Sequence, residues 1–164
     1  NEMTSMLDSY VSFVKTESPE PIETIIINEL IGDIVRTVEK NGLELTIKDK
    51  NIIQTSGRQI QLKRAFNNII DNSQRYAKKI EIILYTNEKD CVIEFNDDGE
   101  GIPRDKYEDV FKPFFTLDPS RNKLKGESGL GLTITRDIIR SHGGDVKLSD
   151  SNLGGLQLKV LLPL

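Results

Sequence analysis

Two hydrophobic periodicities run along this chain and predict its helices and strands. The apolar runs IILY and CVIEF, joined by TNEKD, predict an antiparallel hairpin. In QLKRAFNNIIDNSQRYA, apolar residues recur every three or four positions, which is the period of an amphipathic helix. The full set of predicted elements is strand 22–27, helix 28–40, strands 43–48 and 51–54, helix 58–77, strands 79–86 and 90–96, a short helix 104–110, helix 129–142, and strands 145–149 and 156–162. We therefore expect an α+β fold, a two-layer α/β sandwich with one mixed, mostly antiparallel sheet and helices on a single face.

The first 17 residues show a helical pattern of their own. Its apolar positions are Met3, Met6, Tyr10 and Phe13, spaced as in the seam of a coiled coil or helical hairpin. SPEP then ends this helix, because two prolines in three residues cannot continue it. The helix either packs on its own domain or is the end of a helical stem. We expect the stem, so that residues 1–17 are a truncated helix remnant of a longer protein and 18–164 form one domain.

Composition narrows the class of protein. With 164 residues and 37% hydrophobic content, the chain can bury one good core. A net charge of -4 gives no electrostatic case for binding nucleic acid, whose binders carry a basic face. No stretch approaches the roughly 18 apolar residues of a membrane helix. The single cysteine, Cys91, lies in an apolar run and is expected in the core.

The glycine-rich sequence GESGLGLT does not satisfy the usual nucleotide motifs. It has the glycine spacing of a P-loop, but Leu132 stands where the lysine is needed, and no strand precedes it. Its glycines instead lead directly into a predicted helix, whose N-terminus favours anions. Arg121, Lys123 and Lys125 lie just upstream. A phosphate site of another kind is therefore expected here.

The acidic loop NDDGEGI follows a predicted strand and needs a different explanation. A calcium loop counted from Asp97 would place glycines where oxygen ligands belong, which excludes an EF-hand. A plain turn is one reading, since Asp and Gly are turn residues. The other is recognition of a base, because the exocyclic amine of adenine donates a hydrogen bond that a carboxylate accepts.

The long helix 58–77 carries two kinds of side chain. Its apolar stripe is Leu62, Phe66, Ile69, Ile70, Ser73 and Ala77. The opposite side holds Arg64, Asn68, Asn72 and Arg75. This second face is either ordinary solvent surface or a ligand face, since amide oxygens suit Mg²⁺ and arginine suits phosphate.

From about residue 20 to 164, the chain resembles the catalytic ATP-binding domain of two-component sensor histidine kinases. These belong to a wider group with the gyrase, mismatch-repair and heat-shock chaperone ATPases. Four motifs occur in the family's order: NNIIDNSQRYA as the N box, Asp97, Gly99 and Gly101 as the first glycine box, FKPFF (111–115) as the F box, and GESGLGL as the second glycine box. The resemblance implies the Bergerat ATP-binding fold, with ATP and Mg²⁺ as ligands.

The resemblance also implies a role for individual residues. Asn68, Asn72 and Arg75 would be catalytic, with Asn72 as the Mg²⁺ ligand, and Asp97 would hold the adenine amine. The implied nucleotide-binding residues are Asn68, Asn72, Arg75, Tyr76, Asp97, Gly99, Gly101, Ile102, Phe115, Lys123, Lys125, Gly126, Ser128, Gly129, Leu130 and Gly131. Residues 112–127 would form a lid that is mobile without nucleotide.

One position separates kinases from hydrolases in this group. Hydrolysing members carry a glutamate four residues before the metal asparagine, where this chain has Asn68. Phosphoryl transfer to a protein therefore fits better than hydrolysis. His142 does not match the family's phosphoacceptor and is expected to close a helix. Three departures from the family pattern, Ser73, Ser128 and Glu100, remove no expected ligand.

The resemblance therefore implies a kinase that transfers the γ-phosphate of ATP to a histidine on an upstream dimerisation hairpin, for relay to a response regulator. It further implies a homodimer and a cytoplasmic domain of an inner-membrane sensor, with no nucleic-acid partner. Two alternatives remain open: a pseudokinase-like module that senses ATP without chemistry, and a self-contained ATPase.

Overall fold

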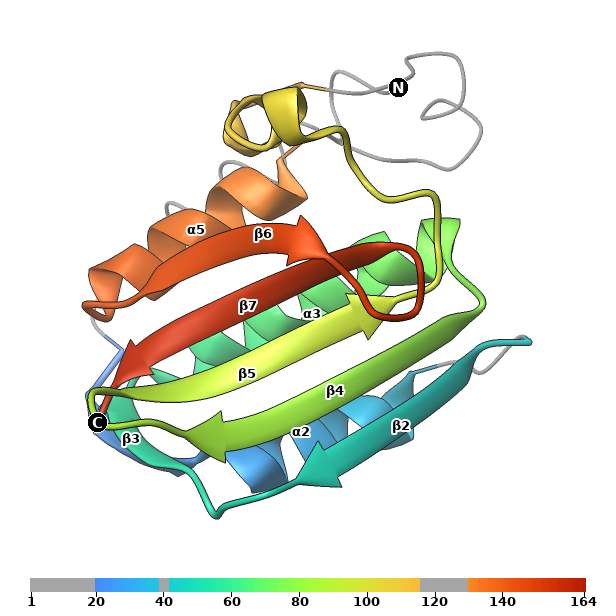
Figure 1. The fold of residues 1–164 in the computed structure, drawn as a ribbon. Helices are drawn as coiled ribbons and strands as arrows, with labels where there is room; N and C mark the ends of the chain where they lie inside the picture. Colours follow the sequence, from blue (N-terminus) through green and yellow to red (C-terminus); the bar gives the residue numbers. More distant parts are fainter. Residues whose placement is uncertain (1–19, 39–41, 116–129) are drawn as a thin grey trace.

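The computed structural model describes residues 20–38, 42–115 and 130–164. Within them, a sheet is covered on one face by helices (Figure 1). The strands are β1 (Glu23–Ile26), β2 (Glu44–Asp49), β3 (Gln54–Gly57), β4 (Lys79–Thr86), β5 (Asp90–Asp97), β6 (Asp145–Asp150) and β7 (Leu156–Pro163). The helices are α2 (Ile27–Thr37), α3 (Gln59–Tyr76) and α5 (Gly131–Ser141), with 3-10 turns η1 (Arg104–Lys106) and η2 (Asp109–Phe111).

The main sheet has five strands in the order β2-β4-β5-β7-β6. β2 and β4 are parallel, and the other neighbours are antiparallel, which confirms a mixed, mostly antiparallel sheet. The prediction of a single sheet is wrong, because β1 and β3 form a separate antiparallel pair. The predicted short helix 104–110 is likewise two 3-10 turns.

The strand predicted at 51–54 lies three residues too early. Ile53 is buried, but its N–H donates to the Asn28 side chain at 2.7 Å and its carbonyl accepts from the Ile27 N–H at 2.9 Å. These residues therefore anchor the start of α2, and β3 begins at Gln54, where pairing with β1 starts.

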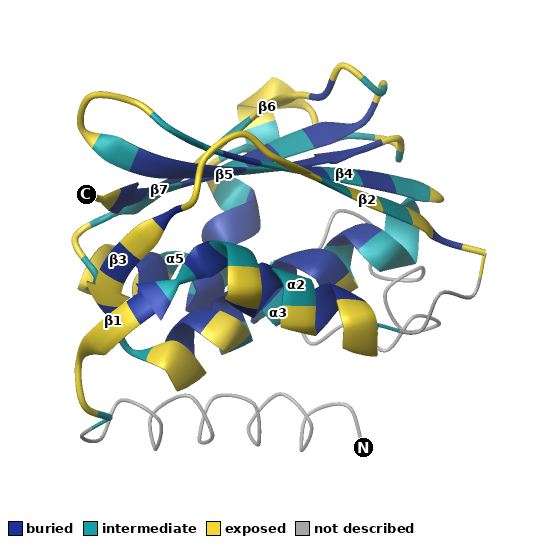
Figure 2. Ribbon diagram, turned by 90° about the horizontal axis from the view of Figure 1, so that it is seen from below, coloured by how far each residue is buried: buried dark blue, intermediate teal, exposed yellow. Residues whose placement is uncertain are grey.

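The core lies between the sheet and the three helices, as the burial pattern in Figure 2 shows. The predicted stripe of α3 is buried from Leu62 to Ser73, and Ala77 is the residue that ends the helix. Phe66 of this stripe packs against Phe95 of β5, with ring centroids 6.2 Å apart. Cys91 is fully buried, as predicted. Burial of each large apolar side chain contributes about 1.5–3 kcal/mol, so α3 is firmly held against the sheet.

Polar side chains lie on the other face of the sheet. Glu94, at its centre, accepts hydrogen bonds from the Tyr85 hydroxyl at 2.5 Å and the Gln157 amide at 3.2 Å. Burial and the bond to Glu94 raise the pKa of Tyr85 to about 12. The placement of helices on a single face is therefore confirmed.

Several expectations fall on residues outside the described ranges. They are the stem helix 1–17, most of the lid 112–127, and the site residues Lys123, Lys125, Gly126, Ser128 and Gly129. Of the helices that the described ranges contain, none combines the length and apolar character needed to cross a bilayer.

Candidate nucleotide-binding site

Asp97 is a buried carboxylate at the end of β5, with 7% of its surface exposed. Its Oδ1 accepts hydrogen bonds from the N–H groups of Gly99, at 3.0 Å, and Leu156, at 2.9 Å. Burial raises the pKa of the Asp97 carboxyl above its ordinary value, and these two N–H groups oppose the shift. The carboxylate is thus fixed in orientation by backbone donors, as a group that recognises a ligand must be.

One glycine, Gly155, allows this arrangement. A Cβ on Gly155 would lie 2.1 Å from Asp97 Oδ1 and 2.5 Å from the Gly99 nitrogen. The N–H of Gly155 also donates to the Asp97 carbonyl at 3.1 Å. The turn between β6 and β7 is therefore packed directly on the acidic loop. The predicted elements did not include this contact, although the Gly-Gly pair in SNLGGLQL is a visible signal for a close approach of the backbone.

The neighbouring acid has a separate, structural role. Asp98 is exposed, and its Oδ1 accepts from the N–H groups of Lys78 and Lys79, both at 2.9 Å. These bonds, that of Lys79 first, lower the pKa of Asp98 below its ordinary value. One acid of the NDDGEGI loop therefore closes the turn between α3 and β4, while Asp97 faces inward beside α3. The role of Asp97 in recognising a base remains a prediction.

Helix α3 contacts both the acidic loop and the N-terminus of α5. At its C-terminal end, a Cβ on Gly99 would lie 2.8 Å from the Tyr76 carbonyl oxygen, so loop and helix are in close contact. Near its middle, the Asn68 amide nitrogen donates to the Gly131 carbonyl at 3.5 Å. Asn68 and Tyr76 are eight residues apart, about 12 Å along the helix axis. The first glycine box therefore adjoins the C-terminal end of α3, and the start of α5 adjoins its middle.

The contact between α3 and α5 is reinforced inside the core. The hydroxyl of the fully buried Thr135 lies 2.7 Å from the Gly131 carbonyl and 3.5 Å from the Ala65 carbonyl. Gly131 is the first residue of α5, two residues after the predicted start at 129, and Leu130 before it is buried. The N-terminus of α5, where anions are favoured, is thus held beside Asn68.

The polar face of α3 is neither buried nor fully exposed. Arg64, Asn68, Asn72 and Arg75 are all half-buried. Asn72 lies one turn beyond Asn68, so both amides lie on the same side of the helix. An amide oxygen of this kind fits Mg²⁺, which prefers oxygen ligands and completes its shell with phosphates and water.

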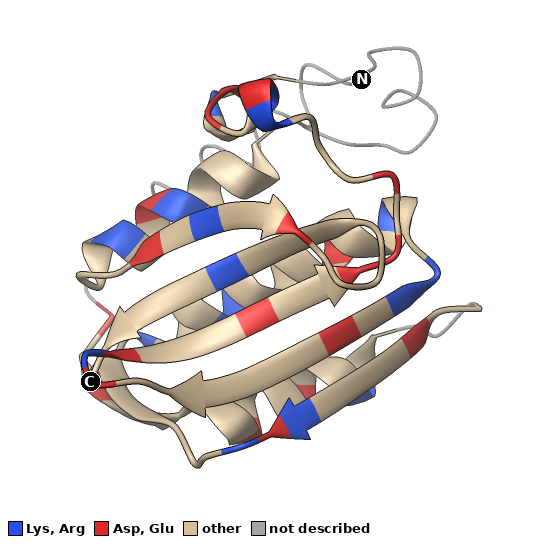
Figure 3. Cartoon of the chain, in the orientation of Figure 1, with Lys and Arg blue, Asp and Glu red and all other residues tan. Residues whose placement is uncertain are grey.

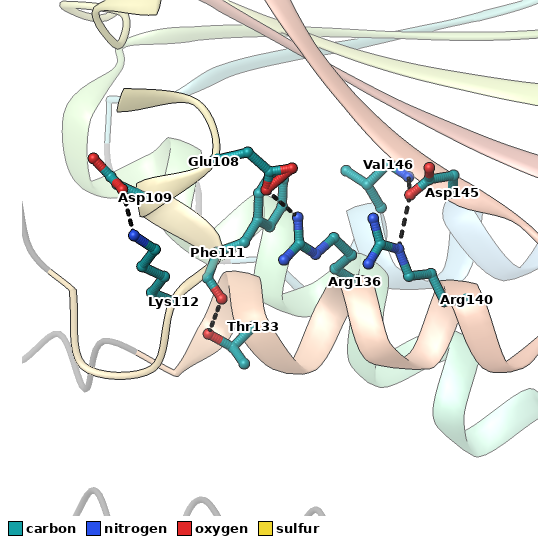
Figure 4. Close-up of polar contacts among 9 residues, drawn as sticks. All are labelled: Glu108, Asp109, Phe111, Lys112, Thr133, Arg136, Arg140, Asp145 and Val146. Atoms are coloured by element: carbon teal, nitrogen blue, oxygen red, sulfur yellow. Dashed lines mark hydrogen bonds and ion pairs between the residues drawn. The ribbon is translucent and has the colours of Figure 1, made fainter. Parts of the chain in front are cut away.

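The F box is anchored to α5 by polar contacts around Arg136 (Figure 4). The Arg136 guanidinium lies 4.3 Å from the Phe111 ring centroid and 2.7 Å from Glu108. The Thr133 hydroxyl donates to the Phe111 carbonyl at 2.7 Å. Phe115 is half-buried against the core. The start of the predicted lid is therefore tied to the first turns of α5.

Two further predicted residues, Gly101 and Ile102, also lie near these elements. Ile102 is half-buried and packs on the core, and Gly101 has a φ of 73°, a conformation that favours glycine. Figure 3 shows residues of both charges along the described chain, with acidic residues gathered at the end of β5 and the loop after it.

His142 has the structural place expected of it, at the end of α5. Its Nε2 accepts from the Arg58 N–H at 3.0 Å, so Nδ1 carries the proton that is shared with the Ile138 carbonyl at 2.8 Å. Besides closing α5, the imidazole therefore ties that helix to the start of α3, a contact that the sequence did not predict.

Comparisons with known proteins agree with this geometry. The sequence model of the histidine kinase-, DNA gyrase B- and HSP90-like ATPases matches residues 57–164. The sensor histidine kinase GtrS of Pseudomonas aeruginosa is 30% identical over 165 residues, covering 99% of this chain and 34% of GtrS. The sensor histidine kinase CpxA of Escherichia coli is 35% identical over 148 residues, covering 87% of this chain and 32% of CpxA. The chain thus spans about a third of the length of these curated relatives.

The fold also matches solved structures. The mycobacterial sensor histidine kinase MprB aligns with a TM-score of 0.76 at 24% identity, covering 87% of this chain and 97% of that one. The catalytic domain of histidine kinase ThkA aligns with a TM-score of 0.74 at 22% identity, covering 87% of this chain and 97% of that one. The chain therefore shares the α+β fold of these structures. This chain belongs to the histidine kinase-, DNA gyrase B- and HSP90-like ATPase family.

Proposed function

We propose that this chain is the ATP-binding catalytic domain of a sensor histidine kinase, which transfers the γ-phosphate of ATP to a histidine on an upstream helical hairpin. The observation that supports it most is the buried, backbone-held Asp97 carboxylate, which lies beside the same helix that contacts the N-terminus of α5 through Asn68. The proposed hydrogen-bond acceptor for the base, Asp97, and a helix N-terminus that favours anions therefore both lie next to α3.

Each group that lies along α3 has a proposed role. Asp97 accepts the hydrogen bond of the adenine amine, and Tyr76 and Ile102 flank the base. Arg75 and the N-terminus of α5 approach the phosphates, which the glycines of the second box surround. Lys123 and Lys125 would add positive charge from the lid. Catalysis then consists mainly of positioning and charge neutralisation.

Asn72 is the proposed Mg²⁺ ligand, since its half-buried amide oxygen is of the type that this ion prefers. Bound Mg²⁺ neutralises negative charge on the phosphates. Asn68 and Arg75 complete the proposed catalytic set by orienting the same phosphates.

Asn68 also favours transfer over hydrolysis. An amide does not accept a proton near neutral pH, so it cannot activate water as a carboxylate would. Its Nδ2 is directed to the Gly131 carbonyl, 3.5 Å away. We therefore propose that Asn68 holds the start of α5 in place rather than generating a nucleophile.

The wider setting is proposed from the relatives, whose names describe them as sensor histidine kinases. In that setting the partners are the chain's own histidine-bearing hairpin, a second copy of the protein, and a response regulator whose aspartate receives the phosphoryl group. The domain would lie in the cytoplasm, attached to a sensor in the inner membrane.

The direct test mixes this domain with the histidine-bearing hairpin and γ-labelled ATP. Acid-labile, base-stable label on the hairpin is the expected result. Release of free labelled phosphate alone would instead identify a self-contained ATPase, and binding without either product would identify an ATP-sensing module.

Asp97→Asn is the matched variant for this experiment. Its amide presents a donor as well as an acceptor and loses the charge, so we expect ATP binding and labelling to be abolished. The fold should survive this change. Burial raises the pKa of Asp97, so ionisation of its carboxyl destabilises the folded state as pH rises through that pKa, and the neutral amide avoids this cost. Wild-type protection against heating by Mg-ATP in this variant would rule out Asp97 as the base reader.

A further inference from the structure

Ser73 places a buried hydroxyl on the otherwise apolar stripe of α3. It is 7% exposed and follows Phe66, Ile69 and Ile70, which are buried on the same side of the helix. A buried hydroxyl is costly unless it has a hydrogen-bond partner. The place of Ser73 in the core therefore depends on the group that it binds.

The partner of this hydroxyl is the carboxylate of Asp97. The two side chains are hydrogen-bonded, and because the bond favours the ionised carboxyl, the hydroxyl is the donor. The acidic loop lies directly against this end of α3, where a Cβ on Gly99 would be 2.8 Å from the Tyr76 carbonyl oxygen. Ser73 belongs to the same last turn, since its own carbonyl accepts from the Ala77 N–H at 2.9 Å. The bond therefore joins the end of α3 to the end of β5.

Three segments of the chain thus donate to one carboxylate. The loop after β5 donates through the Gly99 N–H, at 3.0 Å, and the turn before β7 through the Leu156 N–H, at 2.9 Å. Helix α3 donates through the Ser73 hydroxyl, which is the side-chain donor among the three. A backbone N–H remains when its own side chain is replaced, whereas the hydroxyl does not. Ser73 is therefore the position at which the choice of side chain acts on the charge of Asp97.

The rest of the surroundings oppose that charge. Burial, the largest contribution, raises the pKa of the Asp97 carboxyl, and the neighbouring Asp98 carboxylate raises it further. The two backbone N–H groups and the Ser73 hydroxyl lower it. On β4, the residue paired with Asp97 is the apolar Ile80. Within the described chain, the groups that favour the ionised form of Asp97 are therefore uncharged hydrogen-bond donors.

We propose that Ser73 is a positioning residue for base selection, which keeps Asp97 an acceptor-only group and thereby makes the site reject guanine nucleotides. An ionised carboxylate accepts from the exocyclic amine of adenine and repels the carbonyl oxygen that guanine carries at the same position. A protonated carboxyl presents an O–H that donates to this carbonyl, so it discriminates less between the bases. The selection of the base rests on the proposed ATP-binding function, whereas the bond between Ser73 and Asp97 does not.

The bond is tested by NMR of the Asp97 carboxyl carbon while the pH of the full chain is changed. The resonance is assigned by its absence in Asp97→Asn. In Ser73→Ala the carboxyl should protonate about one to two pH units higher than in the unmutated chain, as expected for loss of one hydrogen bond to a charged group. Thr55→Val is the matched control: it removes another buried hydroxyl, which donates to the Pro163 carbonyl at 3.2 Å, and should leave the titration unchanged.

Base selection is measured as the ratio of the dissociation constants of Mg-GTP and Mg-ATP, by calorimetry between about pH 4.5 and about pH 8. Protonation of the triphosphate cancels in this ratio because both nucleotides carry it. The preference for ATP should weaken at a higher pH in Ser73→Ala than in the unmutated chain. Between the two carboxyl titrations the ratio should be up to about tenfold smaller in the variant, and well above both it should be equal.

Two results would overturn the inference. Superimposable titrations of the Asp97 carboxyl in Ser73→Ala and the unmutated chain would show that the hydroxyl does not hold the charge. A shifted titration with the same nucleotide ratio at every pH would show that this charge does not select the base. If the unmutated chain bound neither nucleotide, the proposed function and base selection would both be rejected, and the carboxyl titration would still decide whether Ser73 keeps Asp97 ionised.

Discussion

Replacing Gly155 by alanine should damage the part of the site where the base is proposed to bind, without removing any proposed ligand-binding side chain. The added Cβ would lie 2.1 Å from Asp97 Oδ1, 2.5 Å from the Gly99 nitrogen and 2.7 Å from the Asp97 carbonyl oxygen. None of these atoms is the end of a flexible exposed side chain. The turn between β6 and β7 must therefore shift away from the acidic loop.

The size of the effect follows from two contributions. Overpacking of this kind costs about 1–3 kcal/mol. The shift also breaks the bond from the Leu156 N–H to the Asp97 carboxylate, now 2.9 Å long, and a hydrogen bond to a charged group contributes about 1.5–3 kcal/mol. The second contribution also acts on the nucleotide, because Asp97 loses its fixed orientation. We expect ATP affinity to fall about 10- to 100-fold.

Calorimetric titration with Mg-ATP measures the affinity, and thermal unfolding monitored by circular dichroism measures stability. A domain of this size loses about 2–4 °C in Tm for each kcal/mol. Gly32→Ala is the matched control: its Cβ would meet only Arg36 Nη1, at 3.5 Å, within helix α2. It should raise stability by about 0.5–1 kcal/mol and leave ATP affinity unchanged. Wild-type affinity and Tm in Gly155→Ala would refute the packing argument.

Two further predictions concern stability. The lowered pKa of Asp98 means that its bonds to the Lys78 and Lys79 N–H groups stabilise the fold above the ordinary aspartate pKa and are lost as pH falls through the folded value. When urea unfolding is measured from about pH 6 down to about pH 3, the free energy of unfolding should therefore fall less steeply with pH in Asp98→Asn than in the wild type. Parallel curves for the two proteins would contradict this role of Asp98. His142→Ala leaves the Arg58 N–H without its imidazole acceptor and should cost about 1–3 kcal/mol in urea unfolding while ATP affinity stays within twofold; an unchanged midpoint would show that water replaces the ring.

Local patterns predicted most of the fold. β4 begins and ends where its alternation does, and α3 matches its apolar stripe to within one residue, because each pattern is complete within one element. β3 was misplaced since Ile52 and Ile53 look like strand residues, whereas the Asn28 side chain holds Ile53 in a loop. Contacts of that kind join positions far apart in sequence, and periodicity contains no signal for them.

The candidate site also combines residues that lie in local motifs with residues that only the folded chain brings together. Asn68, Asn72 and Asp97 stand in short motifs that resemble those of the family, so they could be proposed as site residues from the sequence, and their roles stay predictions. The contribution of Gly155 could not be predicted in this way, because only the folded chain brings the last hairpin against the acidic loop. The hydrogen bond between Ser73 and Asp97 likewise forms only once α3 packs beside the loop after β5.

A crystal structure of the domain with a non-hydrolysable Mg-ATP analogue tests the assignment of base and phosphates most directly. The account predicts the adenine amine within about 2.7–3.2 Å of the Asp97 carboxylate and the phosphates at the N-terminus of α5. Phosphates bound at the acidic loop, or a purine remote from Asp97, would contradict it.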